Sequence, residues 1–218
     1  MGKATLFGAA YSVYVRIARL VMEEVCMPYD LVEVDIFSKH DVPPDYAARH
    51  PFGKIPAFEH EGFRLFETDA VAHYVIGVSE NRDLMPDAPR ERSRVIQIMR
   101  IMDHYAYPFL VQRVFVEEVE RGRRDRLEAR DKAQAENVLA VLDGLMERPF
   151  LAGDGLTAAD LWAAPMFAYL RLAPTGRRLL AGFPRLQAWS ELMLARPSLV
   201  ATRYPAEPEC AGTSSRGG

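Results

Sequence analysis

Residues 50–74 read HPFGKIPAFEHEGFRLFETDAVAHY, and this stretch decides the fold. Residues 55–60 and 63–66 have the composition of two short strands, and the Glu-Gly pair between them suits a tight hairpin turn. Pro56 stands at the start of the first strand, where a residue without an N–H is tolerated, and the preceding bond is a place where a cis peptide can form. The stretch therefore predicts a β-hairpin that is entered through a proline.

A helix is predicted directly after the hairpin, and its first turn suits an anion. Apolar residues recur at helical spacing along residues 70–78. Glu67 and Thr68 stand at the helix start, where free backbone N–H groups and the positive end of the helix dipole favour a carboxylate. A cis peptide at Pro56 would also leave the main chain of Ile55 free to pair with an extended peptide. Together these features favour a small peptide with a free acid end as the ligand.

The same residues carry a family resemblance. Pro-Phe-Gly-Lys-Ile-Pro-Ala-Phe at residues 51–58, followed by Glu-Thr-x-Ala-Val-x-x-Tyr at residues 67–74, resembles the glutathione-binding signature of the cytosolic glutathione transferases. Members of that family usually have serine where this chain has Thr68, and the threonine keeps the hydroxyl. The resemblance implies a glutathione-binding set made of Ile55, Pro56, Glu67 and Thr68.

Three basic residues are candidates for binding the glycyl carboxylate of glutathione. Related transferases place a basic residue of the preceding loop against this group, and Lys39 and His40 lie in the corresponding predicted loop. The sequence does not determine the length of that loop, so either residue or neither reaches the ligand, and a solvated side chain is the alternative. Lys54, next to Ile55, is a further candidate.

The chemistry is expected where the first strand, residues 4–8, meets the first helix, residues 13–27. A thioredoxin-like fold normally carries a redox Cys-x-x-Cys at this turn, and here the turn reads Ser-Val-Tyr-Val from Ser12. Because neither end holds a thiol, disulfide exchange through a protein cysteine is excluded at this site. A hydroxyl near a helix start remains.

Residues 11–20 resemble the Ser-Pro-Tyr-Val-Arg turn of phi-like and related serine-type bacterial transferases, with Val13 in place of the proline found in many members. The resemblance implies that Ser12 is catalytic. Its hydroxyl and the helix dipole would favour the thiolate of bound glutathione and lower the pKa of the sulfur, so that the thiolate attacks an electrophilic carbon. The alternative is that Ser12 only caps the helix, and both roles can coexist because different atoms serve them.

The order of predicted elements divides the chain into two domains. A second strand at residues 29–35 completes the order β-α-β, irregular segment, β-β-α, which is thioredoxin-like and has its first two strands parallel. All apolar periodicity after the linker is helical. The predicted class is therefore α/β plus all-α, with a thioredoxin-like glutathione-binding domain at residues 1–80, a linker at 81–92, an all-helical domain lining the electrophile site at 93–204 and a disordered tail at 205–218.

Within the helical domain we expect long helices at residues 92–122 and 127–148, the first disturbed at Pro108. A Thr157-x-x-Asp160 capping box is expected to open a further helix, and a last one is expected at residues 184–196. Four aromatic residues could line the site of the second, electrophilic substrate, although aromatic residues at helical spacing are more often core. They are Tyr11, Tyr105, Phe109 and Phe115.

Composition bounds the remaining possibilities. The 218-residue chain has a formal net charge of −3, which gives no electrostatic case for nucleic acid or an anionic membrane, and no apolar run is long enough to span a bilayer. Cys26 and Cys210 show neither a disulfide framework nor metal-ligand spacing, so a reducing cytoplasm is expected. No metal and no tightly held organic cofactor is implied.

The sequence thus predicts a cytoplasmic glutathione transferase that conjugates glutathione, its cosubstrate, to small apolar electrophiles. A homodimer is expected because the clefts of that family lie beside a dimer interface. One alternative is a glutathione-dependent isomerase or dehalogenase, although such enzymes often need a cysteine in the first turn. Another is a transferase-like binding module without chemistry, which would have no need of Ser12, the Ile-Pro edge and the Glu-Thr helix start together.

Overall fold

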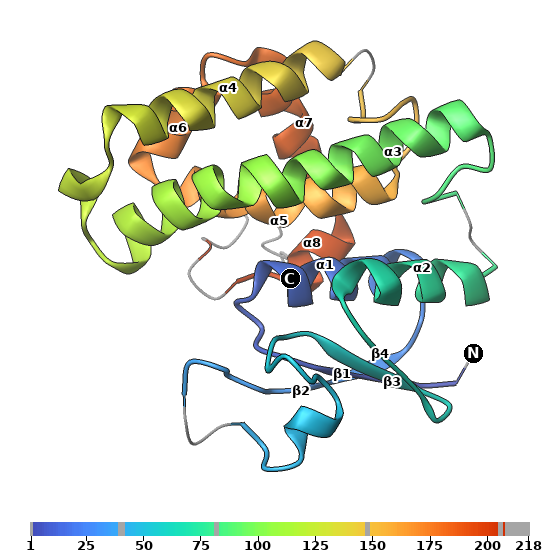
Figure 1. Ribbon diagram of the computed structural model, residues 1–218. Coiled ribbons are helices and arrows are strands. Elements are labelled where there is room, and N and C mark those ends of the chain that lie inside the picture. The colour runs from blue at the N-terminus through green and yellow to red at the C-terminus, as the bar shows by residue number, and fades with distance from the viewer. Residues whose placement is uncertain (1, 39–41, 81–82, 147–148, 205–206, 208–218) are drawn as a thin grey trace, which may run out of the picture.

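The computed structural model describes residues 2–38, 42–80, 83–146, 149–204 and 207 of the chain. A four-stranded sheet forms the lower layer in Figure 1, two helices lie on one of its faces, and the remaining helices stack above them. The elements of the lower part are β1 Ala4–Phe7, α1 Val13–Glu24, β2 Tyr29–Val32, the short 3₁₀ turn η1 Tyr46–Ala48, β3 Ala57–His60, β4 Phe63–Phe66 and α2 Thr68–Val78.

The sheet confirms the predicted thioredoxin-like topology. Its strand order is β2-β1-β3-β4, with β1 and β2 parallel and the other neighbouring strands antiparallel. The hairpin turn is made by Glu61 and Gly62, whose φ angles of 51° and 80° are both positive, as a two-residue turn with the twist of the strands requires. The peptide bond between Ile55 and Pro56 is cis.

All the long elements of the upper part are helices. They are α3 Pro89–Ile101, η2 Met102–Glu120, the short turn η3 Arg124–Arg126, α4 Ala129–Leu145, α5 Ala158–Leu172, α6 Pro174–Leu180, α7 Pro184–Leu194 and α8 Pro197–Ala201. Every residue from Ala158 to Leu170 of α5 is buried, so this helix is the centre around which the others pack. The fold class predicted from the sequence is therefore confirmed.

The long helix predicted at residues 92–122 is a continuous rod in Figure 1, formed by α3 and η2. Its second half is a π-helix that contains Pro108, the residue at which a disturbance was expected. Proline has no N–H to donate and its ring crowds the carbonyl one turn earlier, so the wider turn accommodates it. The rod remains continuous, but η2 has more residues per turn than α3. The set of side chains that share one face therefore differs between its two halves.

Element boundaries differ from the predicted ones at several points. β2 ends three residues before residue 35, β3 begins just after Pro56, and α1 and α4 are each three residues shorter at their C-terminal ends than the predicted segments. α3 begins at Pro89, inside the predicted linker 81–92, because proline suits the first turn of a helix. α6 and α8 were not predicted, since five to seven residues are too few to show a helical period. The domain boundaries themselves stay a prediction, and the predicted tail lies outside the described residues except for Glu207.

The predicted capping box at the start of α5 is present and buried. Asp160 accepts hydrogen bonds from the N–H of Thr157 at 2.9 Å and from its hydroxyl at 3.0 Å. It also accepts from the N–H of Leu151 and from the indole of Trp189, both at 2.9 Å. One carboxylate therefore joins the loop before α5, the start of α5 and the middle of α7.

Candidate active site

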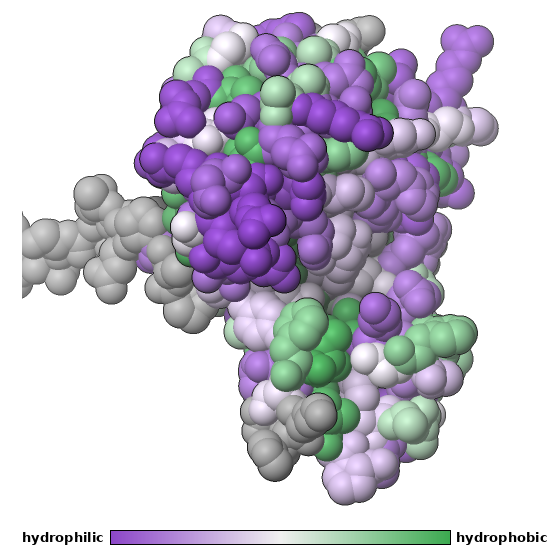
Figure 2. Space-filling model, turned by 60° about the vertical axis from the view of Figure 1, so that its left-hand side comes forward, coloured by the Kyte–Doolittle hydropathy of each residue, from purple (hydrophilic) through white to green (hydrophobic). Residues whose placement is uncertain are grey.

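A cavity of about 920 Å³ lies between the two parts of the molecule. From the lower part it is lined by the β1–α1 turn, the segment before β3 and the start of α2, and from the upper part by η2 and α5. On one side of the molecule, an apolar area of the lower part adjoins a strongly hydrophilic surface of the helical part (Figure 2). The predicted site residues that line the cavity are Tyr11, Ser12, Lys54, Ile55, Pro56, Glu67, Thr68 and Phe115.

Ser12 stands at the N-cap of α1 with extended backbone angles. The N–H of Val15 lies 3.5 Å from the Ser12 hydroxyl oxygen, which is at the outer limit of a hydrogen bond, so capping holds this hydroxyl only loosely. The side chain is half-buried and lines the cavity. The hydroxyl is thus free to donate to a ligand atom placed at the N-terminus of the helix.

The edge before β3 and the start of α2 face the same cavity. Among the described residues, no hydrogen bond is made by the main chain of Ile55, as an edge that pairs with an extended ligand requires. Thr68 is buried, and within the described part of the chain its hydroxyl makes only a long contact of 3.4 Å with the carbonyl of Tyr14. Glu67 has a φ of 69°, a left-handed conformation that costs a non-glycine residue about 1–3 kcal/mol. The sequence carried no sign of this strained residue.

Two predicted electrophile-site residues do not line the cavity. Tyr105 is 60% exposed, and Phe109 packs against the helical core. The cavity-facing side of η2 instead runs through Tyr107, Val111 and Phe115, at intervals of four. Tyr105 and Phe109 fall outside this row, so the structure does not bring them to the cavity with Tyr11 and Phe115. Lys39 and His40 lie outside the described residues.

Several lining residues were missed by the sequence analysis. His50 is only 2% exposed, burial lowers its pKa, and its Nδ1 has no hydrogen-bond partner within the described part of the chain. Tyr169, from α5, donates its hydroxyl to the carbonyl of Tyr11 at 2.7 Å and so fixes the residue before Ser12. His50 belongs to the quoted stretch and could have been considered there. Tyr169 is 158 residues away from Tyr11, and no local signal connects them.

A charged network lies on the helical side of the cavity. Asp103 accepts from the indole of Trp162 at 3.0 Å and pairs with Arg100 at 3.0 Å, and Arg100 also reaches Asp69 at 3.4 Å. Burial raises the pKa of Asp103 above its usual range, while the nearby Arg100 opposes the shift. These contacts connect η2 to the first turn of α2. They hold the helical part against the start of α2, where a carboxylate of the ligand is predicted to bind.

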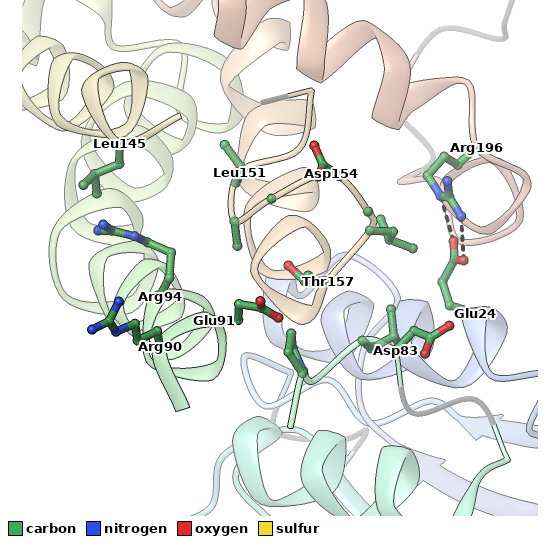
Figure 3. A pocket seen from close by; sticks show the side chains of 16 residues that line it. Glu24, Asp83, Arg90, Glu91, Arg94, Leu145, Leu151, Asp154, Thr157 and Arg196 are labelled. Atoms are coloured by element: carbon green, nitrogen blue, oxygen red, sulfur yellow. Dashed lines mark hydrogen bonds and ion pairs between the residues drawn. The ribbon is translucent and has the colours of Figure 1, made fainter. Parts of the chain in front are cut away.

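A second cavity of about 800 Å³ lies where α1 ends and α3 and α5 begin (Figure 3). Figure 3 shows Arg196 paired with Glu24, and Nη2 of Arg196 lies 2.7 Å from Oε2 of Glu24. Thr157 of the capping box also lines it. None of the described residues that line this second cavity belongs to the predicted ligand-binding set. The first cavity is therefore the candidate active site, because it combines a hydroxyl at a helix start with an unpaired main-chain edge.

Two features are absent from the described residues. No group of three or more His, Cys, Asp or Glu side chains there could hold a metal ion. Within the same residues, no helix is both long and apolar enough to cross a bilayer.

A thioredoxin-like domain, a helical domain and a hydroxyl at the first helix start define the class of glutathione-dependent transferases. Residues 2–76 match the N-terminal domain of glutathione S-transferase, and residues 118–192 match its C-terminal domain. The chain is 30% identical over 211 residues to glutathione S-transferase 3 of Zea mays, with 93% of this chain and 94% of that protein covered. This chain belongs to the glutathione S-transferase family.

Other relatives agree with this assignment. A probable glutathione S-transferase, GSTF1 of Oryza sativa subsp. japonica, is 28% identical over 208 residues, covering 91% of this chain and 94% of the relative. The solved structure of glutathione S-transferase III in apo form is 29% identical with a TM-score of 0.79, covering 92% of this chain and 95% of that one. The structure of glutathione S-transferase-I bound with lactoylglutathione is 22% identical with a TM-score of 0.82, covering 91% of this chain and 97% of that one, and supports the fold alone.

Proposed function

We propose that this protein is a glutathione transferase of the serine type, close to the phi-like group, which conjugates glutathione to small apolar electrophiles. The observation that carries the proposal is the loosely bound Ser12 hydroxyl in a cavity shared with the Ile55–Pro56 edge and the Glu67-Thr68 helix start. A free thiol with a pKa of about 8.5 is only a few per cent ionised at neutral pH. A hydrogen bond from Ser12 and the positive end of α1 both stabilise the thiolate, so more of the bound glutathione is reactive.

The remaining contacts follow from the shape of glutathione. The main chain of Ile55, beside Pro56, would pair with the backbone of the tripeptide, and the start of α2 with Glu67 and Thr68 would hold its γ-glutamyl end. Lys54 lines the cavity and is the described candidate for the glycyl carboxylate, while Lys39 and His40 remain candidates outside the described residues.

The second substrate would lie on the helical side of the sulfur. Tyr11 and Phe115 line the cavity there, together with Tyr107, Val111 and Tyr169. These side chains are largely aromatic or aliphatic, which suits an apolar electrophile. The thiolate would attack its electrophilic carbon and displace a leaving group, or add to it, with no metal required for the step.

Binding to immobilised glutathione, followed by conjugation of a chlorodinitrobenzene, tests this proposal. Retention with turnover is the expected result. Retention without turnover would favour the glutathione-dependent isomerase or dehalogenase, and absence of both would favour a transferase-like binding module.

Thr68→Val is expected to raise the Kd for glutathione about fivefold to tenfold, because the loss of one hydrogen bond to a bound group is worth about 1–1.5 kcal/mol. The valine keeps the shape of the side chain, and kcat at saturating glutathione should stay within about twofold. Titration calorimetry and steady-state kinetics measure the two quantities. Thr5→Val, on the strand β1, is the matched control. An unchanged Kd would remove Thr68 from the binding set.

We further propose a cytoplasmic homodimer. Large apolar or aromatic side chains at the surface, such as Phe52 at 71% exposure, Tyr105 at 60% and Phe63 at 48%, are the kind that an interface covers. Cys26 is a free, exposed thiol, which suits a reducing compartment. Light scattering should give twice the 24.6 kDa mass of one chain. A mass of one chain at micromolar concentration would exclude the dimer.

A further inference from the structure

Arg16 is a charged residue with no exposed surface. It lies on α1, one turn after Ser12, and its guanidinium sits 5.8 Å from the centre of the Tyr169 ring. One nitrogen donates to the carbonyl of Leu199 at 3.2 Å, while Nε has no hydrogen-bond partner in the described part of the chain. A buried cation is costly unless an anion compensates it. The fold must therefore supply a carboxylate at this place.

Glu207 is the residue that supplies it. Both carboxylate oxygens accept from the Arg16 guanidinium, the second at 3.3 Å, and the Glu207 side chain is itself only 8% exposed. The two residues are 191 positions apart in the sequence. No other carboxylate contacts Arg16 among the described residues. The positive charge of Arg16 on α1 is thus neutralised by Glu207, a residue near the C-terminal end of the chain.

Glu207 also holds Tyr204 in place. The N–H of Tyr204 donates to the Glu207 carboxylate at 3.1 Å, and the N–H of Glu207 donates back to the Tyr204 carbonyl at 2.9 Å. These reciprocal bonds join Tyr204 directly to the residue that pairs with Arg16. We call Tyr204 and Glu207 together the latch.

Tyr204 contacts three residues that line the candidate active site. Its ring packs 5.2 Å from that of Tyr169 and 6.3 Å from that of Phe115, both edge to face, and its hydroxyl donates to Glu120 at 2.8 Å. Phe115 and Tyr169 are stacked on each other at 4.9 Å. The latch therefore supports the cavity wall from behind. It makes no contact with the Ile55 edge or with the start of α2 in the described structure.

We propose that the latch is a positioning element for the second-substrate wall: Glu207 neutralises Arg16, and this pair anchors Tyr204 behind Phe115 and Tyr169. The inference rests on the proposed function, since it assigns the electrophile to that wall. Loss of the latch should weaken the site for the electrophile and leave the site for glutathione intact. A role in folding alone would lower stability without separating the two substrates.

The test compares Glu207→Gln and Tyr204→Ala in the full chain with Glu136→Gln, an exposed glutamate of α4. Both latch variants should raise KM for a chlorodinitrobenzene about tenfold, because packing in an apolar pocket is lost, and change the Kd for glutathione by less than about twofold. Tyr204→Ala leaves the Arg16–Glu207 pair intact. If Glu207→Gln folds poorly, Tyr204→Ala still tests whether the latch supports the wall of the electrophile site. An unchanged KM for the electrophile in folded variants would overturn the proposal, even if Tm falls.

A second measurement does not depend on activity. Glu207→Gln should lower Tm by about 5–10 °C because it leaves a buried cation unpaired, and adding Arg16→Met should recover most of that loss. If Arg16→Met and Glu207→Gln lowered Tm by amounts that simply add in the double variant, the two residues would not be energetically paired and the proposal would be overturned. A wild-type protein that binds no glutathione and conjugates nothing would refute the proposed function, whereas this cycle would still test the latch.

Discussion

Ser12→Ala is expected to lower kcat about 10-fold to 100-fold, which corresponds to the loss of a hydrogen bond to a charged atom worth about 1.5–3 kcal/mol. The Kd for glutathione should change by less than about twofold, because the Ile55 edge and the start of α2 still hold the tripeptide. The sulfur loses a donor that favours its ionised form, so the pKa of the bound thiol should rise toward its free value. At neutral pH a smaller fraction of the complex is then reactive.

Two measurements separate activation from binding. Steady-state kinetics give kcat, and the ultraviolet absorbance of the thiolate during a pH titration gives the pKa of bound glutathione. Ser12→Thr keeps a hydroxyl and should restore a large part of the rate, while Ser93→Ala, on the exposed side of α3, should leave it unchanged. If kcat and affinity for glutathione fell by the same factor, Ser12 would hold the ligand and would not activate it.

Asp160→Ala is expected to lower the free energy of unfolding by about 3–5 kcal/mol, which is a large part of the stability of an ordinary domain. The reason is the number of donors that this carboxylate satisfies. Four buried donors would lose their acceptor together. They are the N–H of Leu151, the N–H and hydroxyl of Thr157 and the indole N–H of Trp189. The cavity left by the side chain adds to the cost.

Chemical denaturation followed by circular dichroism measures this loss. Asp125→Ala, an exposed aspartate in η3, is the matched control and should change stability by less than about 0.5 kcal/mol. Thr157→Val removes one of the four donors and should cost about 1–2 kcal/mol. A loss of less than about 1 kcal/mol for Asp160→Ala would show that the start of α5 does not depend on this carboxylate.

The features that the sequence predicted well are set by neighbours along the chain. The β-hairpin needs the positive φ of two adjacent residues, Glu61 and Gly62, and the start of α5 needs the contact of Asp160 with a residue three positions before it. Ser12 could be placed at a helix start because the apolar period begins just after it. Signals of this range remain visible in a single sequence, since the chain itself brings the interacting groups together.

The parts that only the tertiary structure decided depend on packing. Phe115 lines the cavity, whereas Tyr105 and Phe109 on the same helix η2 do not, and the side of η2 that faces the cavity is decided by how the helix packs. Tyr169 reaches the turn before Ser12 from near the C-terminal end of α5. Glu207 meets Arg16 across most of the length of the chain. Contacts between residues so far apart follow from how helices stack and from which buried charge needs a partner, and a local sequence pattern records neither.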